Sequence, residues 1–186
     1  MAKGVIWYWS LRQHLIDGRI LAVKKKYVIW HQITYRTIIT WKEVDMGYLS
    51  KEQANRLLGE PIISFLTTIN CDGSPHTSPV WHLLNEDNSH IWVATSKTAV
   101  KARNLRMDQR VSLVSAADRF PQPWVQVNGA ACIKEPMDID DIVSHLAYHY
   151  LGSEQAPVYL REILGNIEFV LVDINPKKTL AFDGEE

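Results

Sequence analysis

Short β-branched and aromatic segments recur between turn residues from position 62 to position 182, and this spacing limits the possible folds most. The segment IISFLTTI (62–69) runs into Asp72-Gly73, a pair that favours a tight hairpin. Further strands are predicted for PHTSPVWHLL, HIWVAT, RVSLVSA, PWVQVNGAACI, NIEFVLVDI and KTLAF. Six or more strands at hairpin spacing, with few helices between them, predict a mainly β fold, a small antiparallel barrel. Closure of the sheet into a barrel removes exposed edges.

Four segments have helical patterns. MGYLSKEQANRLLGEP predicts a capped helix, with Ser50 as N-cap and Gln53 three residues later. The other three are predicted at 98–107, 139–151 and about 156–164.

Charge and composition describe an ordinary soluble chain. The 186 residues are 46% hydrophobic with a formal net charge of -1, which gives no reason to expect nucleic acid or an anionic membrane as the main partner. Cys71 and Cys132 have no disulfide or zinc spacing. No apolar run reaches the roughly 18–20 residues that span a bilayer, and no signal peptide is evident, so a cytoplasmic location is expected.

The first 45 residues differ from the rest. They hold eight Lys or Arg against three Asp or Glu and four of the seven tryptophans, without clean alternation. Three interpretations stay open: a small subdomain, a basic aromatic segment that lies on a membrane or partner, and an extension that precedes a natural start at Met46. We therefore divide the chain into residues 1–45, an extension of uncertain status, and residues 46–186, the main domain.

The segment ATSKTAVKARNL has cations at the predicted start of a helix, where acidic residues are usual. If Ser96 or Thr98 caps this helix, Lys97 and Lys101 share one face beside Thr95. Hydroxyls, free backbone N–H groups and ammonium groups are what a phosphate monoester needs. A phosphate site is one interpretation, and a solvated basic face is the other. No P-loop or Rossmann glycine pattern is present.

Histidines and tryptophans give weaker signals. His145 and His149 are four residues apart, but without a third ligand no metal site is predicted. His76 and His82 lie six apart in one predicted strand. Trp81, Trp92 and Trp124 fall in three strands, either as core residues or as a wall for a planar ring.

Taken together, DGSPHTSPVW, VATSKTAVKARNLRMDQRVSL and WVQVNGAACI resemble the pyridoxamine 5'-phosphate oxidase-like, FMN-binding split-barrel family, and most closely its branch of probable coenzyme F-420-dependent enzymes. The resemblance implies a six-stranded antiparallel split β-barrel that forms a homodimer, with cofactors between the subunits. It implies cofactor-binding roles for the following residues: Ser78, Pro79, Val80 and Trp81 at the ring, Ala94, Thr95, Ser96 and Lys101 near the phosphate, and Trp124 approaching from the other subunit.

The chain also departs from true pyridoxamine phosphate oxidases. Val100 stands where they have an arginine, Leu83 stands where they have a substrate-contacting lysine, and the final TLAFDGEE lacks their Arg-rich motif. Pyridoxamine phosphate is therefore not the expected substrate. Lys97 is expected to compensate for the missing arginine.

The resulting hypothesis is a flavin- or deazaflavin-dependent oxidoreductase acting on a small conjugated substrate, with FMN or coenzyme F-420 as cofactor and no assigned catalytic residue. The anionic tail of the deazaflavin would need further cations, for which the candidates are Lys51, Arg56, Lys97 and Arg103. His76 or His82 could supply a proton. The alternative is a non-enzymatic flavin- or haem-binding carrier or sensor, since a fold does not fix a function. His145 and His149 are the residues that could support haem.

Overall fold

The computed structural model describes residues 5–7, 15–16, 19–20, 25–33, 36–44 and 47–184. Contacts divide the chain into two units, Met1–Gly47 together with Glu185–Glu186, and Tyr48–Gly184. The boundary predicted from sequence lies two residues earlier, and the status of residues 1–45 stays a prediction.

The described part of the first unit consists of antiparallel strands. One sheet has the order β1-β4-β5, with bounds Val5–Trp7, Lys25–Ile33 and Arg36–Val44. A second pair joins β2 (Leu15–Ile16) to β3 (Arg19–Ile20).

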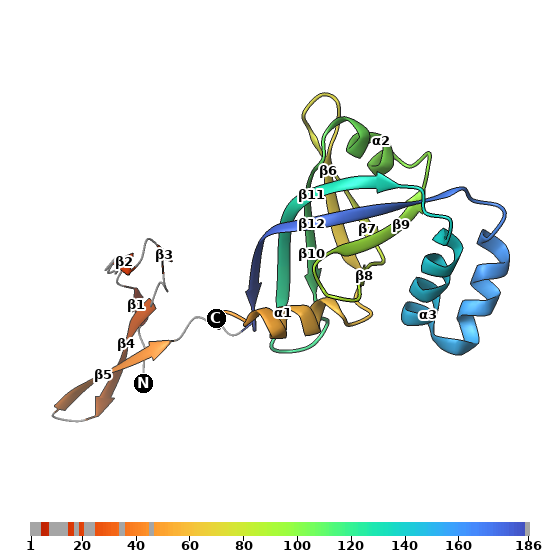
Figure 1. Ribbon diagram of the computed structural model, residues 1–186. Coiled ribbons are helices and arrows are strands. Elements are labelled where there is room, and N and C mark those ends of the chain that lie inside the picture. Colours follow the sequence, from red (N-terminus) through yellow and green to blue (C-terminus); the bar gives the residue numbers. More distant parts are fainter. Residues whose placement is uncertain are drawn as a thin grey trace. The chain divides into compact units, whose positions relative to one another are not determined.

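The second unit is built on a curled antiparallel sheet of seven strands in the order β7-β6-β10-β11-β12-β9-β8 (Figure 1). The bounds are β6 Ser64–Ile69, β7 Pro75–Val80, β8 Leu83–Leu84, β9 Ile91–Ser96, β10 Arg110–Ala116, β11 Trp124–Lys134 and β12 Phe169–Phe182. The mainly β antiparallel fold predicted from sequence is confirmed. The architecture is a half-barrel of the split-barrel type.

The strand number predicted from the resemblance was wrong by one. The segment PHTSPVWHLL does not form a single strand: β7 pairs with β6, and β8 pairs with β9 at the opposite edge of the sheet. Trp81 and His82 carry the chain from one edge to the other. Because the two edge strands follow each other along the chain, the sheet is curled back on itself.

The last strand differs from the sequence prediction as well. Segments 166–174 and 178–182 were expected as two strands, but β12 is continuous and has a bulge directly after Pro176. The register passes from Gly129↔Pro176 to Asn128↔Lys178, which leaves Lys177 without a partner in the ladder. A Cβ on Gly129 would lie 2.3 Å from the carbonyl oxygen of Asn175, so only glycine allows this approach.

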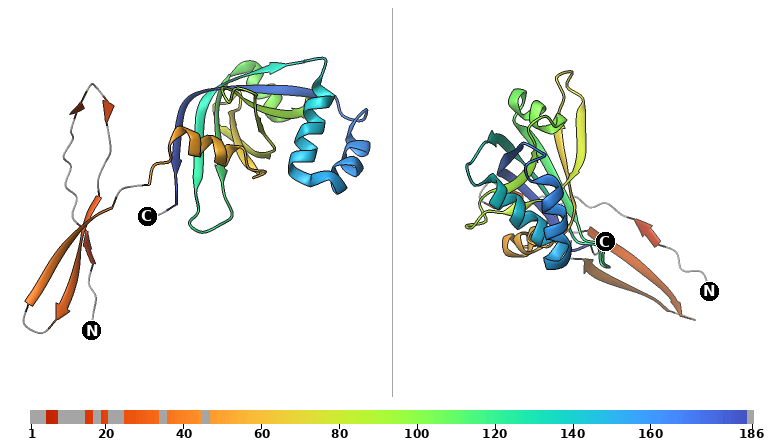
Figure 2. Two further views of the ribbon diagram at one scale, coloured as in Figure 1. Left: turned by 60° about the horizontal axis from the view of Figure 1, so that its bottom comes forward. Right: turned by 90° about the vertical axis from the view of Figure 1, so that its right-hand side faces the viewer.

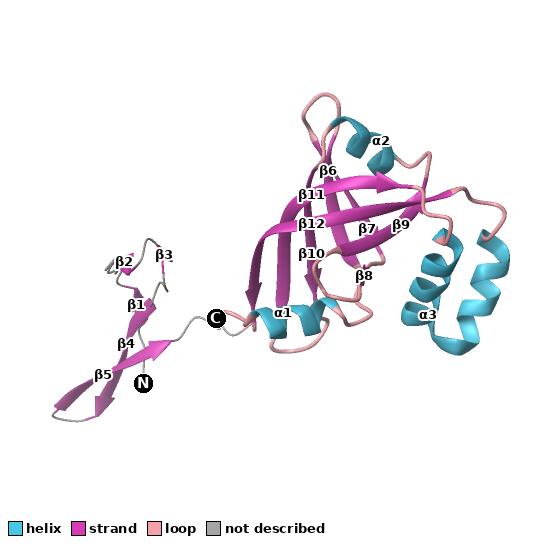
Figure 3. Cartoon of the chain, viewed as in Figure 1, coloured by secondary structure: helices cyan, strands magenta, loops and turns pink. Residues whose placement is uncertain are grey.

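Three helices accompany the sheet in the second unit (Figure 3). In α1 (Lys51–Leu58), Ser50 and Gln53 form the predicted capping box. The helix α2 (Val100–Met107) has Ala99 as its N-cap, without a side-chain cap, so neither of the two caps considered from sequence, Ser96 and Thr98, is used. None of the described helices is long and apolar enough to cross a membrane.

The third helix, α3 (Ile139–Ile163), has two arms that lie side by side (Figure 2). Gly152 interrupts it with φ 72° and ψ -179°. Glycine adopts a positive φ without a steric clash because it has no Cβ. The two helices predicted at 139–151 and 156–164 correspond to these arms.

The barrel interior holds the main core, and α3 packs on the outside of the sheet over a second apolar layer. The largest apolar side chains that are almost completely buried in the barrel are Leu66, Ile91, Val93, Leu105, Leu113, Val125, Val127, Val172 and Ile174. Alternate residues of β9 point into the two apolar layers: Val93 is buried in the barrel, and Ala94 faces α3. The layer beneath α3 is where a cavity forms.

Candidate cofactor site

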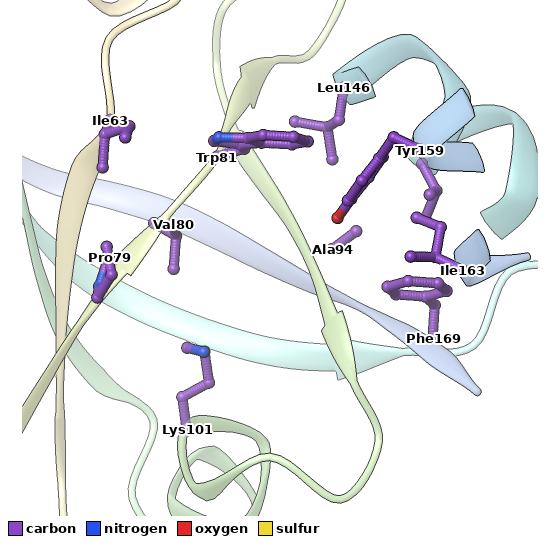
Figure 4. A pocket seen from close by; sticks show the side chains of 11 residues that line it. Ile63, Pro79, Val80, Trp81, Ala94, Lys101, Leu146, Tyr159, Ile163 and Phe169 are labelled. Atoms are coloured by element: carbon purple, nitrogen blue, oxygen red, sulfur yellow. The ribbon is translucent and has the colours of Figure 1, made fainter. Parts of the chain in front are cut away.

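A cavity of about 350 Å³ lies between the end of β7, β9, α2 and α3 (Figure 4). This volume falls within the range of roughly 300–1,000 Å³ that small-molecule sites occupy. Its lining residues are Ile63, Pro79, Val80, Trp81, Ala94, Lys101, Val143, Leu146, Tyr159, Ile163 and Phe169. Of the nine predicted site residues, the structure thus brings five together: Pro79, Val80, Trp81, Ala94 and Lys101.

Lys101 is the single cation among these lining residues. Its side chain extends from the first turn of α2 toward β7 (Figure 4). It is half-buried, and burial lowers the pKa of its ammonium group below the ordinary lysine value. Within the part of the chain that the structure describes, this ammonium forms no ion pair or hydrogen bond. A partly desolvated cation without a partner is a favourable site for an anion.

Trp81 forms an aromatic wall of the cavity and is held by both arms of α3. Its ring stacks on Tyr150 with the centroids 5.1 Å apart and the planes at 12°. Tyr159, from the second arm, contacts the same indole at 5.3 Å and 56°. Figure 4 shows the hydroxyl oxygen of Tyr159 pointing toward Ala94. This arrangement fixes the indole, so the wall is formed before any ligand binds.

His82 is in the barrel interior and is only 1% exposed. Its Nε2 donates to the carbonyl of Leu58 at 2.8 Å, which leaves Nδ1 to accept from the hydroxyl of Ser64 at 3.1 Å. Burial lowers the pKa of His82 to about 4, despite the hydrogen bond to Leu58, which raises it. His82 is therefore neutral at pH 7 and does not line the cavity.

The expected cluster of Thr95, Ser96 and two lysines is only partly assembled. Thr95 is 7% exposed and alternates with Ala94, so it faces the barrel interior. The hydroxyl of Ser96 is bonded to Thr98, at 3.0 Å to Oγ1. Neither lines the cavity.

Lys97 was wrongly placed on the helix, because α2 begins three residues later. Its ammonium donates to Glu168 at 2.6 Å and lies 3.4 Å from Glu135. The hydrogen bond to Glu168 is the main reason that its pKa is raised. Since two carboxylates already neutralise it, Lys97 is poorly suited to replace a missing arginine.

The remaining predicted site residues lie apart from the cavity. Ser78 alternates with Pro79 on β7, and its hydroxyl oxygen is buried without a hydrogen-bond partner in the described region. Trp124 stacks on Phe182, with ring centroids 5.0 Å apart. Trp92 packs against the layer under α3 with Trp81, so the three tryptophans do not form one wall. The cofactor-binding roles of all nine residues stay predictions.

No group of three or more His, Cys, Asp or Glu side chains that could hold a metal occurs among the described residues. His145 is exposed, and His149 makes an edge contact with the ring of Tyr150. Neither histidine lines the cavity. Cys71 and Cys132 are free and exposed.

Sequence reasoning missed the half of the site that α3 provides. Val143, Leu146, Tyr159 and Ile163 line the cavity from its two arms. The sequence predicted both helical segments, but nothing in them indicated which strands they would cover.

A sequence model of the family described as pyridoxamine 5'-phosphate oxidase matches residues 50–180. The chain belongs to the pyridoxamine 5'-phosphate oxidase family. The matched range includes every residue that lines the cavity. No curated protein matches the chain.

Solved structures share this fold with the chain. A conserved hypothetical protein of Mycobacterium tuberculosis, Rv2991, matches with 24% identity over 77% of this chain and 91% of its own, at a TM-score of 0.63. A structure described as an F420 reductase matches with 19% identity over 70% and 98%, at a TM-score of 0.58. The haem storage protein HutZ of Vibrio cholerae matches with 19% identity over 69% and 90%, at a TM-score of 0.52. At these identities the likeness shows the fold alone.

Although the chain belongs to the pyridoxamine 5'-phosphate oxidase family, it has apolar residues at two positions where true pyridoxamine phosphate oxidases are expected to have cations. Leu83 packs in the apolar cluster beneath α3. Val100 is 38% exposed at the start of α2. Among the described residues that line the cavity, Lys101 is thus the only cation.

Proposed function

We propose that the protein is an oxidoreductase that binds FMN, or alternatively the deazaflavin coenzyme F-420, in the cavity between β7, β9, α2 and α3. The observation that carries the proposal is Lys101, a half-buried ammonium without a partner in the described region, at the edge of an otherwise apolar and aromatic cavity. Such a cavity suits a planar ring that carries a phosphate. Family membership and the F420 reductase among the similar structures support the same class of ligand.

In this proposal each group of lining residues contacts a different part of the cofactor. Lys101 would hold the phosphate, Trp81 would orient the ring, and the apolar side chains of α3 would exclude water. A bound flavin or deazaflavin would supply hydride transfer, a reaction that belongs to the cofactor and not to protein side chains. The hydroxyl of Tyr159 would donate a hydrogen bond to a small conjugated substrate.

In this proposal the protein is a cytoplasmic homodimer, and Trp124 of the partner subunit approaches the ring. Two of the four cations considered for the tail of coenzyme F-420 do not lie at this cavity as free charges. Lys97 pairs with Glu168, and Lys51 lines a different cavity. Arg103 is exposed on α2. This distribution favours FMN over the deazaflavin.

The test compares ligands with and without the phosphate. FMN and riboflavin are titrated against the parent protein and against Lys101→Met, with binding followed by flavin fluorescence. Loss of the ammonium should raise the Kd for FMN by about tenfold or more and leave the Kd for riboflavin unchanged. Lys101→Arg, which keeps the charge, should retain most of the FMN affinity.

Two results would overturn this assignment. Equal losses for FMN and riboflavin would show that Lys101 does not hold the phosphate. If neither FMN nor coenzyme F-420 binds the parent protein, the cofactor proposal fails.

A carrier without catalysis is the second candidate, because Lys101 and Tyr159 are the only titratable side chains among the lining residues. Anaerobic stopped-flow absorbance separates the two functions. An oxidoreductase should accelerate the oxidation of bound, chemically reduced cofactor by a small quinone such as menadione, relative to free cofactor, whereas a carrier should slow it. Haem titration, followed by its absorption band, tests the same cavity for the other ligand class.

A further inference from the structure

A second cavity, of about 440 Å³, is larger than the first and shares no lining residue with it. It is formed mainly by α1, the turn after β8 and the last part of β12. Figure 3 shows α1 beside the end of β12. Two local ties fix this arrangement: the N–H of Leu49 donates to the carbonyl of Ala181 at 3.0 Å, and Tyr48 forms an isolated bridge with Phe182.

Two cations line this cavity, Lys51 from the first turn of α1 and Lys177 from β12. None of the described residues that line it carries a carboxylate. Of the acidic neighbours in sequence, Glu52 accepts from Ser50 and also interacts electrostatically with Lys51, and Asp87 accepts from Ser89. Neither lysine forms an ion pair within the described region. Lys51 and Lys177 are therefore the only charged side chains among the described residues that line the cavity.

Lys177 is brought to the cavity by the bulge. It is the residue of β12 that the ladder with β11 omits, and it lines the cavity together with Thr179. Lys178, between them, does not. Bulges re-aim single side chains, and this one requires Gly129 opposite it, where a Cβ would collide with Asn175. The lysine is thus placed by a specific feature of the backbone.

The floor of the cavity is apolar. Ala54, Ile91 and Val127 are each no more than 2% exposed and belong to the barrel core. Leu58 and Leu84 extend the same surface. An occupant must therefore combine an apolar body with a negative group at the rim, where the side chains of Asn55 and Asn88 have no partner in the described region.

We propose that this cavity is a second binding site, separate from the cofactor site, for a small amphipathic anion such as a medium-chain carboxylate. The apolar chain lies on the floor under α1, and Lys51 and Lys177 pair with the carboxylate. The site does not depend on the proposed cofactor, because the two cavities have no lining residue in common.

The experiment is isothermal titration calorimetry of the full chain with octanoate at pH 7, with 1-octanol and acetate as probes of the two halves of the ligand. The expected result is one octanoate per chain, with much weaker binding of either probe. Lys51→Met combined with Lys177→Met should weaken octanoate by about tenfold or more and leave 1-octanol unaffected.

Three variants locate the site. Lys178→Met removes the neighbouring charge outside the cavity and should bind octanoate as the parent does. Lys101→Met should do the same, because it changes only the cofactor site. Thr179→Trp fills the cavity from an exposed strand position and should abolish binding. Circular dichroism confirms that each variant is folded.

The proposal is overturned if octanoate does not bind, or if it binds equally to the double lysine variant. It is also overturned if Lys101→Met or Lys178→Met weakens binding as much as the double variant does.

Discussion

The ring of Tyr150 stacks on the indole of Trp81, and the hydroxyl of the same tyrosine accepts the backbone N–H of His82 at 3.1 Å and donates to the carbonyl of Ile62 at 3.1 Å. One side chain therefore docks α3, orients a wall of the cavity and satisfies the backbone where the chain crosses between the sheet edges.

Tyr150→Phe should lower the free energy of unfolding by about 1–3 kcal/mol, because it keeps the stacked ring but leaves two backbone groups without a partner. Urea unfolding at pH 7 measures the change. The matched control is Tyr148→Phe, which alters an exposed hydroxyl without a hydrogen-bond partner in the described region. Equal stability of the two variants would show that the hydroxyl contributes nothing.

His82 should make the protein less stable as the pH falls from 6.5 to 4. Its pKa is about 4 in the folded state, lowered mainly by burial, whereas the ordinary pKa of histidine is 6.5, so the unfolded chain takes up the proton first. The full shift corresponds to about 3 kcal/mol. Urea unfolding at pH 7 and pH 4.5 should therefore show a large loss in the parent and a smaller loss in His82→Gln. A variant with the same loss as the parent would refute this origin.

Asp173 should affect the free energy of unfolding at a lower pH than His82 does. Burial would raise the pKa of this carboxyl, but its hydrogen bonds with Lys134 and His90 outweigh burial and lower it below 3.8. Its contribution to stability is then complete above pH 3.8 and is lost as the pH falls through the lowered pKa. Asp173→Asn should cost about 1–3 kcal/mol at pH 7, with the difference from the parent narrowing below pH 3.8. Asp118→Asn, at an exposed carboxyl, is the control and should leave the free energy of unfolding at pH 7 nearly unchanged.

Gly129→Ala should destabilise the fold by about 1–3 kcal/mol, since its Cβ would meet the backbone of β12 at 2.3 Å. Gly59→Ala is the comparison, because Gly59 has φ -82° and its nearest contacts are at 3.4 Å. Thermal unfolding of both variants measures the difference. Similar midpoints would mean that the strand pair relaxes without cost.

Local patterns predicted the local features of the fold. The capping box of Ser50 and Gln53 and the hairpin at Gly73 depend on residues that are close in sequence, and both form. The crossing at Trp81 and His82 could not be predicted, because it depends on β8 pairing with β9 rather than on the composition of its own segment.

In the candidate site too, the residues in local motifs were predicted, and those placed by distant contacts were missed. Lys101 and Trp81 were identified because they belong to motifs that resemble the family, and both line the cavity. Tyr159 was missed, since its position depends on the turn at Gly152 that brings the second arm of α3 back against the first. The assumed partnership of Lys97 with Lys101 failed because Glu168, 71 residues away, occupies that ammonium.

The crossing between the sheet edges has a consequence for any ligand of this protein. Trp81 and His82 are adjacent, yet one faces the cavity under α3 and the other faces the barrel core. A molecule that contacts the indole therefore touches the segment by which the chain crosses between the sheet edges. A ligand that binds the folded protein in this cavity should raise the melting temperature as its concentration rises, and this increase should disappear in a variant whose cavity no longer binds it.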